Sequence, residues 1–79
     1  MKTSVQWLDI MTYGDRRPLS VAKLARLAIC ETVGILIAED EAKIVIAHSK
    51  QTIPDTLEDF VSEYTVIPKG CIISREDYE

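Results

Sequence analysis

The residues best suited to covalent or metal chemistry are few and widely spaced. His48 is the only histidine, and the only cysteines are Cys30 and Cys71. Nucleophilic catalysis needs a hydroxyl or thiol beside a general base, but in an extended strand Ser49 points to the opposite face from His48. A zinc site usually contains a close ligand pair such as Cys-x-x-Cys, which this chain lacks. We therefore expect no enzyme, no metal and no cofactor, and we expect both cysteines to be reduced and buried.

Two other ligand-binding patterns are also missing from the sequence. The glycines Gly14, Gly34 and Gly70 stand alone, so no glycine-rich loop can cradle a phosphate group. The acidic run 39–41 lacks the alternating spacing of a calcium loop. We interpret it as the solvated tip of a hairpin.

Charge is divided unevenly along the chain. The net charge is −4, yet residues 1–30 carry +3 and residues 31–79 carry −7. The acidic total opposes long-range attraction to nucleic acid or to an anionic membrane. Binding of phosphate would therefore need a local patch. The candidate phosphate or partner contacts are Arg16, Arg17, Lys23, Arg26, Lys69 and Arg75, and the candidates for stacking on a base are Trp7 and Tyr64.

The length of 79 residues allows one small domain, residues 1–79. Such a chain buries only about 60–65% of its unfolded surface, and its expected stability is about 4–12 kcal/mol. No apolar run approaches the ~18 residues of a membrane span, and the N-terminus lacks the pattern of a signal peptide. We therefore expect a cytoplasmic protein without a membrane partner.

The elements that position these residues are mainly β-strands, because β-branched residues are dense between short polar breaks. The predicted strands are 5–10, 30–38, 43–49, 63–67 and 71–75. The spacing of Val21, Leu24, Ala25 and Ala28 predicts one short helix over 20–29, capped by Ser20. This helix is too short to be stable alone, so we expect it to pack on the sheet. The second and third strands are apolar at consecutive positions, which predicts that both their faces are buried.

Three positions predict local backbone features. Gly34 interrupts an apolar strand, which indicates a bend or a close approach of another backbone. Pro68 and Gly70 predict a tight structural turn, with Pro68 at its second position and Gly70 closing it with a positive φ. Residues 77–79 are predicted to be a frayed tail.

Residues 50–62 form the one long polar segment. We predict a loop here, with one helical turn over 56–60, and regard it as a candidate for specific contacts. The alternative is a solvated connection whose Leu57 and Phe60 rest on the sheet.

Gly34, Leu36 and Asp40 form one motif, and Lys69 and Gly70, followed by Ile72 and Ile73, form a second. These match the two motifs of Sm-like proteins, so residues 30–75 resemble that family. The resemblance implies a mainly β (α+β) fold with one short helix, a small, strongly bent five-stranded antiparallel barrel of the Sm-like or Src-homology-like type. The family's base-binding Asn falls near Ile44, and Lys69 replaces its usual Arg, so the resemblance extends to the barrel and not to the RNA pocket.

The apolar runs around the acidic turn, together with residues 65–72, are also similar to small uncharacterised proteins of bacteriophages and prophage-bearing bacteria. This second resemblance implies a phage-like family and no particular activity.

Two function classes remain. The first is a non-catalytic interaction module that self-associates as a homo-oligomer, or binds another protein, through a strand edge or an apolar face. The third strand, 44–48, is predicted to offer that edge because it lacks Pro and repeated Lys. The second is a small barrel that binds single-stranded RNA or DNA. The sequence identifies neither a partner nor a pathway.

Overall fold

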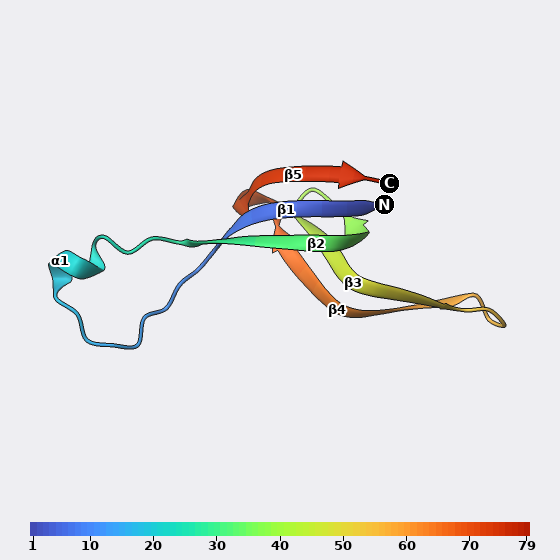
Figure 1. The fold of residues 1–79 in the computed structure, drawn as a ribbon, viewed down its shortest axis with the longest axis horizontal. Coiled ribbons are helices and arrows are strands. Elements are labelled where there is room, and N and C mark those ends of the chain that lie inside the picture. Colours follow the sequence, from blue (N-terminus) through green and yellow to red (C-terminus); the bar gives the residue numbers. More distant parts are fainter.

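The computed structural model describes residues 1–79 and contains one antiparallel sheet of five strands (Figure 1). The strands are β1 (Lys2–Asp9), β2 (Ala28–Glu39), β3 (Lys43–Ile53), β4 (Glu58–Pro68) and β5 (Ile72–Tyr78). The predicted mainly β, antiparallel fold is therefore confirmed. The sequence locates all five strands, although the structure makes each of them longer than predicted.

The strand order across the sheet is β4-β3-β2-β1-β5. The first and last strands, β1 and β5, are paired, and this pairing begins with Lys2 opposite Tyr78. The two chain ends therefore lie side by side (Figure 1). The edge strands β4 and β5 are joined by a single 3-10 turn, η1 (Lys69–Cys71). They do not pair with each other, so the bent sheet is open and a closed barrel is not observed.

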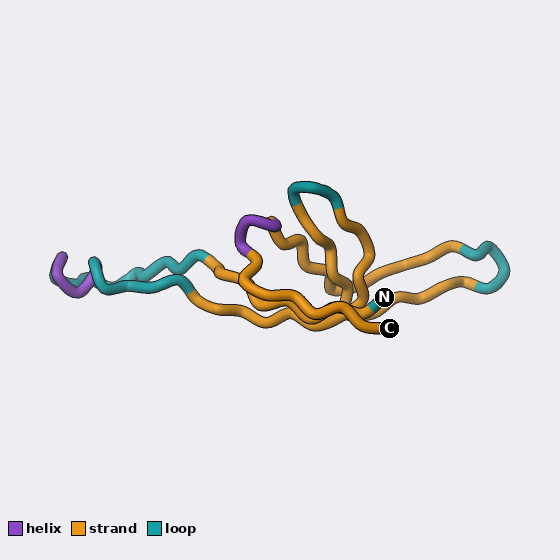
Figure 2. The backbone as a smooth tube through the Cα atoms, turned by 90° about the horizontal axis from the view of Figure 1, so that it is seen from above, coloured by secondary structure: helices purple, strands orange, loops and turns teal.

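The sheet bends where its register shifts. One shift lies between Leu36 and Ala38 in the pairing of β2 with β3, and another lies between Gln6 and Trp7 in the pairing of β1 with β5. An extra residue in one strand bends that strand and increases its twist. Figure 2 shows the result, in which the strand segments beside the turn between β2 and β3 rise away from the other strands.

The core forms inside this bend. Val5 of β1, Ile44 and Ile46 of β3 and Ile67 of β4 form one fully buried cluster, although β2 separates β1 from β3 in the sheet. A Cβ at Gly34 of β2 would collide with the carbonyl oxygen of Ala47, and it would lie 2.8 Å from the Ile46 Cγ2 atom. The predicted close approach at Gly34 is thus confirmed, because only glycine leaves room for β3.

The predicted helix over 20–29 is wrong. The structure has one helical turn, α1 (Leu19–Ala22), and Ala28 already pairs with Asp9 of β1. Ala28 and Ile29, which the helical spacing assigns to the last turn of that helix, therefore pair with β1 instead. The turn does not pack on the sheet but projects beyond it (Figure 1). The outer face of β2 consequently stays open, with Ile29 and Val33 exposed, so the expectation that both faces are buried is wrong for β2. For β3 it holds only over residues 44–47, where the side chains of both faces are buried or half-buried.

Residues 50–62 are not a loop with a helical turn. β3 continues to Ile53, β4 starts at Glu58, and a four-residue turn joins them. Paired strands satisfy the backbone groups that the predicted loop would have left to water. The predicted edge over 44–48 is also wrong, because residues 44–47 pair with β2 on one side and with β4 on the other.

The turn before β5 differs from its prediction. Pro68 has φ −63° and ψ 134°, so it is extended and precedes η1 instead of occupying the second position of the turn. Gly70 has no positive φ. The C-terminal residues are not frayed as predicted, because β5 includes Asp77 and Tyr78.

Candidate interaction site

The long connection between β1 and β2 forms an arm, residues 10–27, called the N-arm here. Every residue of this arm is exposed. Its hydrogen bonds are local, such as those from the amides of Val21 and Ala22 to the carbonyl of Pro18. No hydrogen bond or ion pair joins residues 11–27 to the sheet, and the arm extends away from it in both views (Figures 1 and 2).

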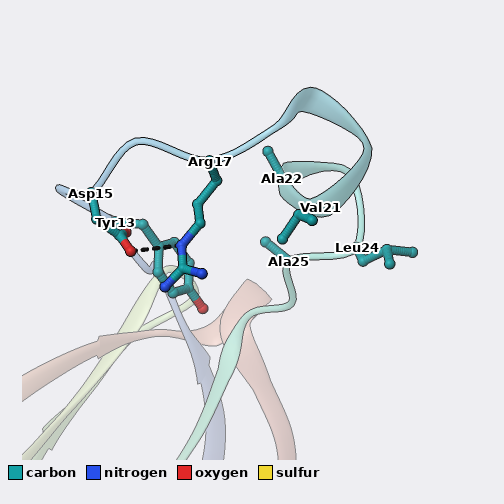
Figure 3. A pocket seen from close by; sticks show the side chains of 7 residues that line it. All are labelled: Tyr13, Asp15, Arg17, Val21, Ala22, Leu24 and Ala25. Atoms are coloured by element: carbon teal, nitrogen blue, oxygen red, sulfur yellow. Dashed lines mark hydrogen bonds and ion pairs between the residues drawn. The ribbon is translucent and has the colours of Figure 1, made fainter.

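The N-arm encloses a mainly apolar hollow of about 550 Å³. Its lining residues are Tyr13, Asp15, Arg17, Val21, Ala22, Leu24 and Ala25. Figure 3 shows Tyr13 and Arg17 on one side of the space and the side chains of α1 and the following residues on the other. Arg17 is held to the Asp15 carboxylate at 2.6 Å, so the charged wall of the hollow is an ion pair.

The N-arm is also strongly basic. Residues 10–27 carry a net charge of +3, from four basic residues and Asp15. Arg16, Lys23 and Arg26 make no ion pair in the structure, and their side chains are exposed. These three predicted contact residues therefore stand on one exposed segment, beside the hollow that Arg17 lines.

A second arm projects from the opposite end of the molecule (Figures 1 and 2). It is the outer part of the β3–β4 hairpin, residues 48–63, called the hairpin arm here. Apart from the half-buried Ile53, all its residues are exposed, including the apolar side chains of Leu57, Phe60 and Val61. Its net charge is −3, from Lys50 against four carboxylates, with the histidine taken as neutral.

The hairpin arm is held by its own cross-strand contacts. Ser49 and Ser62 share a hydrogen bond of 2.7 Å between their Oγ atoms, and the Thr52 hydroxyl donates to Asp59 at 2.6 Å. The Thr52 hydrogen bond and the nearby Lys50 hold the pKa of Asp59 below its usual value. No third strand covers this ribbon, and an isolated two-stranded hairpin is at best marginally stable in water.

Two of the predicted phosphate contacts already have carboxylate partners. Arg75 makes a bidentate pair with Glu39, with both N–O distances at 2.9 Å, and also binds Asp77. Lys69 lies 2.8 Å from the same Glu39 carboxylate. The hydrogen bond from Arg75, followed by that from Lys69, lowers the pKa of Glu39 to about 2. This Glu39 cluster joins the end of β2 to β5 and to η1, so its two cations stand apart from those of the N-arm.

The two candidate stacking residues have different environments. Trp7 is half-buried against the core, and its indole nitrogen donates to the Thr32 hydroxyl at 2.9 Å. Tyr64 on β4 is 61% exposed. Of the two predicted aromatic rings, only that of Tyr64 is thus open to a ligand.

The residues considered for covalent chemistry are dispersed over the sheet. Cys30 and Cys71 are free thiols, and both are half-buried rather than buried as predicted, because neither belongs to the small core cluster nor packs against it. The Cys30 sulfur lies 4.0 Å from Asp9, and the Ser49 hydroxyl bonds Ser62. His48 is exposed and borders a small polar hollow with Glu31 and Glu63. No group of three or more His, Cys, Asp or Glu side chains is arranged to hold a metal ion.

The hairpin arm is a structural element that the sequence prediction lacks, although a local signal was present. Pro54 and Asp55 are common turn residues, and they are flanked by Thr52 and Ile53 on one side and Phe60 on the other. Strand formers on both sides of a turn pair are typical of a hairpin. The Glu39 cluster had no such signal, because Glu39 and Arg75 are 36 positions apart.

No protein-family model matches this chain, and neither the curated proteins nor the solved structures include a significant match. The resemblances to Sm-like proteins and to phage proteins therefore stay predictions. None of the helical segments has the length and apolar character needed to cross a membrane.

Proposed function

We propose that this protein is a non-catalytic interaction module that self-associates through its two arms. The observation that carries the proposal is the amount of exposed surface. The accessible surface is 6395 Å². A compact monomer of this mass exposes about 4,800 Å², so the excess is roughly 1,600 Å².

The shape supports the same proposal. The Cα radius of gyration is 17.0 Å, and the molecule extends 60 × 23 × 19 Å. A compact domain of this length has a radius of gyration of about 12 Å. Only six residues are buried, and all of them lie on β1, β3 and β4 near the bend. Covering the exposed apolar side chains of the arms would remove them from water, which contributes about 25 cal/mol per Å² before the costs of association.

We also propose that the body is a partly open small barrel of the Src-homology-like type. The order β4-β3-β2-β1-β5 and the 3-10 turn between the two edge strands support this, because closing the sheet would bring consecutive strands together. In such a barrel the N-arm is inserted between β1 and β2, and the hairpin arm is inserted between β3 and β4. A change in the contacts that either arm makes therefore leaves the core unchanged.

Light scattering across a range of protein concentrations tests self-association. We expect a mass above that of one chain, which increases with concentration. A mass of one chain up to high micromolar concentration, at both low and high salt, would contradict the proposal.

Single-stranded nucleic acid is a second candidate partner, and one observation favours it. The unpaired Arg16, Lys23 and Arg26 stand together on the N-arm. Against it, Lys69 and Arg75 are occupied by Glu39, and the whole chain is acidic. A gel-shift titration on single-stranded RNA at several salt concentrations tests this candidate, because phosphate binding weakens steeply with salt. Binding that is absent even at low salt would exclude it.

A further inference from the structure

We infer that copies of this chain associate head to tail, with the tip of one hairpin arm seated in the N-arm hollow of the next copy. This inference rests on the proposed self-association and names the two surfaces that meet. The occupant of the hollow is a second copy of the chain. The contact is heterologous, because each copy offers a hollow at one end and a tip at the other.

The chemistry of the two surfaces is complementary. The hollow is lined on one side by Val21, Ala22 and Ala25, and the tip presents Leu57 at 77% exposure and Phe60 at 50%. Both surfaces are therefore apolar and open to water in a single copy. Seating one against the other covers both.

The charges around these apolar surfaces are opposite. The N-arm carries +3 and the hairpin arm carries −3. Two N-arms or two hairpin arms would repel each other, whereas one of each attract. Charge thus favours a heterologous contact over a symmetric contact between like arms.

The shape of the molecule makes the contact intermolecular. The arms extend from opposite ends of the long axis, along which the chain measures 60 Å (Figures 1 and 2). The hairpin tip cannot reach the hollow of its own chain. A repeated head-to-tail contact produces a closed ring when the rotation between copies closes, and an open filament when it does not.

The available area agrees with two such contacts per copy. A standard interface buries roughly 800 Å² on each partner. A copy inside a ring or filament uses both arms and therefore buries about 1,600 Å². The whole chain exposes about 1,600 Å² more than a compact monomer of its mass, so two contacts of this size would leave it no more exposed than such a monomer.

The tip also carries a local conformational outlier. Leu57 has φ 58°, a left-handed conformation that side chains other than glycine and asparagine rarely adopt. Its amide donates a hydrogen bond of 2.7 Å to the carbonyl of Ile53, so this conformation closes the turn of the hairpin. It holds the exposed Leu57 side chain at the tip, where the proposed contact lies.

Two variants test the contact by complementation. Val21→Asp with Ala25→Asp places charge in the hollow, and Leu57→Asp with Phe60→Asp places charge on the tip. Each variant alone lacks one of the two surfaces, so each is expected to be a monomer. Mixed at equal concentrations, they retain one intact hollow and one intact tip, so the mixture is expected to form a dimer and nothing larger. Ile73→Asp, on the exposed side of β5, is the matched control and keeps the mass of the wild type.

The outcomes separate the contact from self-association itself. A wild-type monomer contradicts the proposed function. A wild-type oligomer whose two arm variants fail to pair with each other overturns the head-to-tail contact alone. Loss of association in Ile73→Asp overturns it as well, because it assigns the interface to the β5 edge. Circular dichroism of each variant checks that the sheet is retained.

A charge reversal gives a second test with variants that leave the apolar surfaces intact. Arg16→Glu with Arg26→Glu is expected to weaken association roughly tenfold, through repulsion between like charges. Mixing it with Asp55→Lys and Glu58→Lys is expected to restore the affinity of the altered contact. A variant whose affinity is unchanged at low salt would overturn the electrostatic part of the contact.

Discussion

The body of the sheet and its two arms differ in the contacts that their residues make. In the body, residues far apart in sequence meet in a small core, and a cluster of ion pairs around Glu39 joins β2 to β5. In the arms, hydrogen bonds are local, and large apolar side chains such as Leu24 and Leu57 face water. The body has the long-range contacts of a folded domain. The arms expose apolar side chains, as a protein interface does when its partner is absent. The difference supports the proposal that the body carries the stability of a single copy and that the arms carry the self-association.

The largest effect is expected from Gly34→Val. The new side chain would meet the backbone of Ala47, which cannot move without breaking the sheet. We expect a loss of about 3 kcal/mol or more in the free energy of unfolding, measured by urea denaturation. Gly70→Val is the matched control, because a Cβ at Gly70 meets nothing within 4 Å and its φ is not positive. That control is expected to change stability by less than about 0.5 kcal/mol. Equal effects of the two substitutions would contradict the packing of β3 over β2.

The next effect separates an apolar residue of the body from one of the N-arm. Ile44→Ala removes a fully buried side chain, so we expect a loss of about 2–4 kcal/mol in stability. Leu24→Ala alters a side chain that is 77% exposed, so its stability as a single copy should change by less than about 0.5 kcal/mol. Thermal denaturation of both variants at low concentration measures the contrast. A large loss of stability in Leu24→Ala would mean that the N-arm folds against the body.

A smaller effect is expected in acid from the Glu39 cluster. Arg75 and Lys69 lower the pKa of Glu39 from 4.5 to about 2 in the folded chain. The folded state therefore gains stability from this carboxylate above pH 4.5 and loses it as the pH falls from 4.5 towards 2. The Glu39→Gln variant should have a lower free energy of unfolding at neutral pH. That free energy should fall less steeply between pH 4.5 and pH 2 than it does in the wild type. Asp40, whose pKa is also lowered to about 2, still contributes in the variant. Urea midpoints measured across this pH range check the slope, and parallel curves would contradict the role of Glu39.

The strands are predictable from the sequence because β formation here follows local composition. Val, Ile and Thr are dense in the segments that form β2, β3 and β4. The close approach at Gly34 is also predictable, since glycine inside an apolar strand commonly marks a bend or a backbone contact. The length of each strand is not predictable in the same way. Pairing partners decide where a ladder ends, and Ala28 joins the sheet because Asp9 lies opposite.

The interaction site is less predictable. The basic residues of the N-arm stand out in the sequence, but the spacing of Val21, Leu24 and Ala25 predicts a helix face that packs on the sheet. In the structure the same three residues line an exposed hollow. Periodicity alone cannot distinguish a helix face that packs on a sheet from the lining of such a hollow. The pairing of Lys69 and Arg75 with Glu39 depends on the bend of the whole sheet. No local pattern could have shown that these cations already had partners.

Amide hydrogen exchange at two protein concentrations measures the division between body and arms residue by residue. We predict that residues 10–27 and 48–63 exchange rapidly in dilute solution and become protected at high concentration. Residues on β1 and β3 near the core should be equally protected at both concentrations. Exchange in the arms that is the same at both concentrations, in a sample at high micromolar concentration, would contradict the assignment of the arms to self-association.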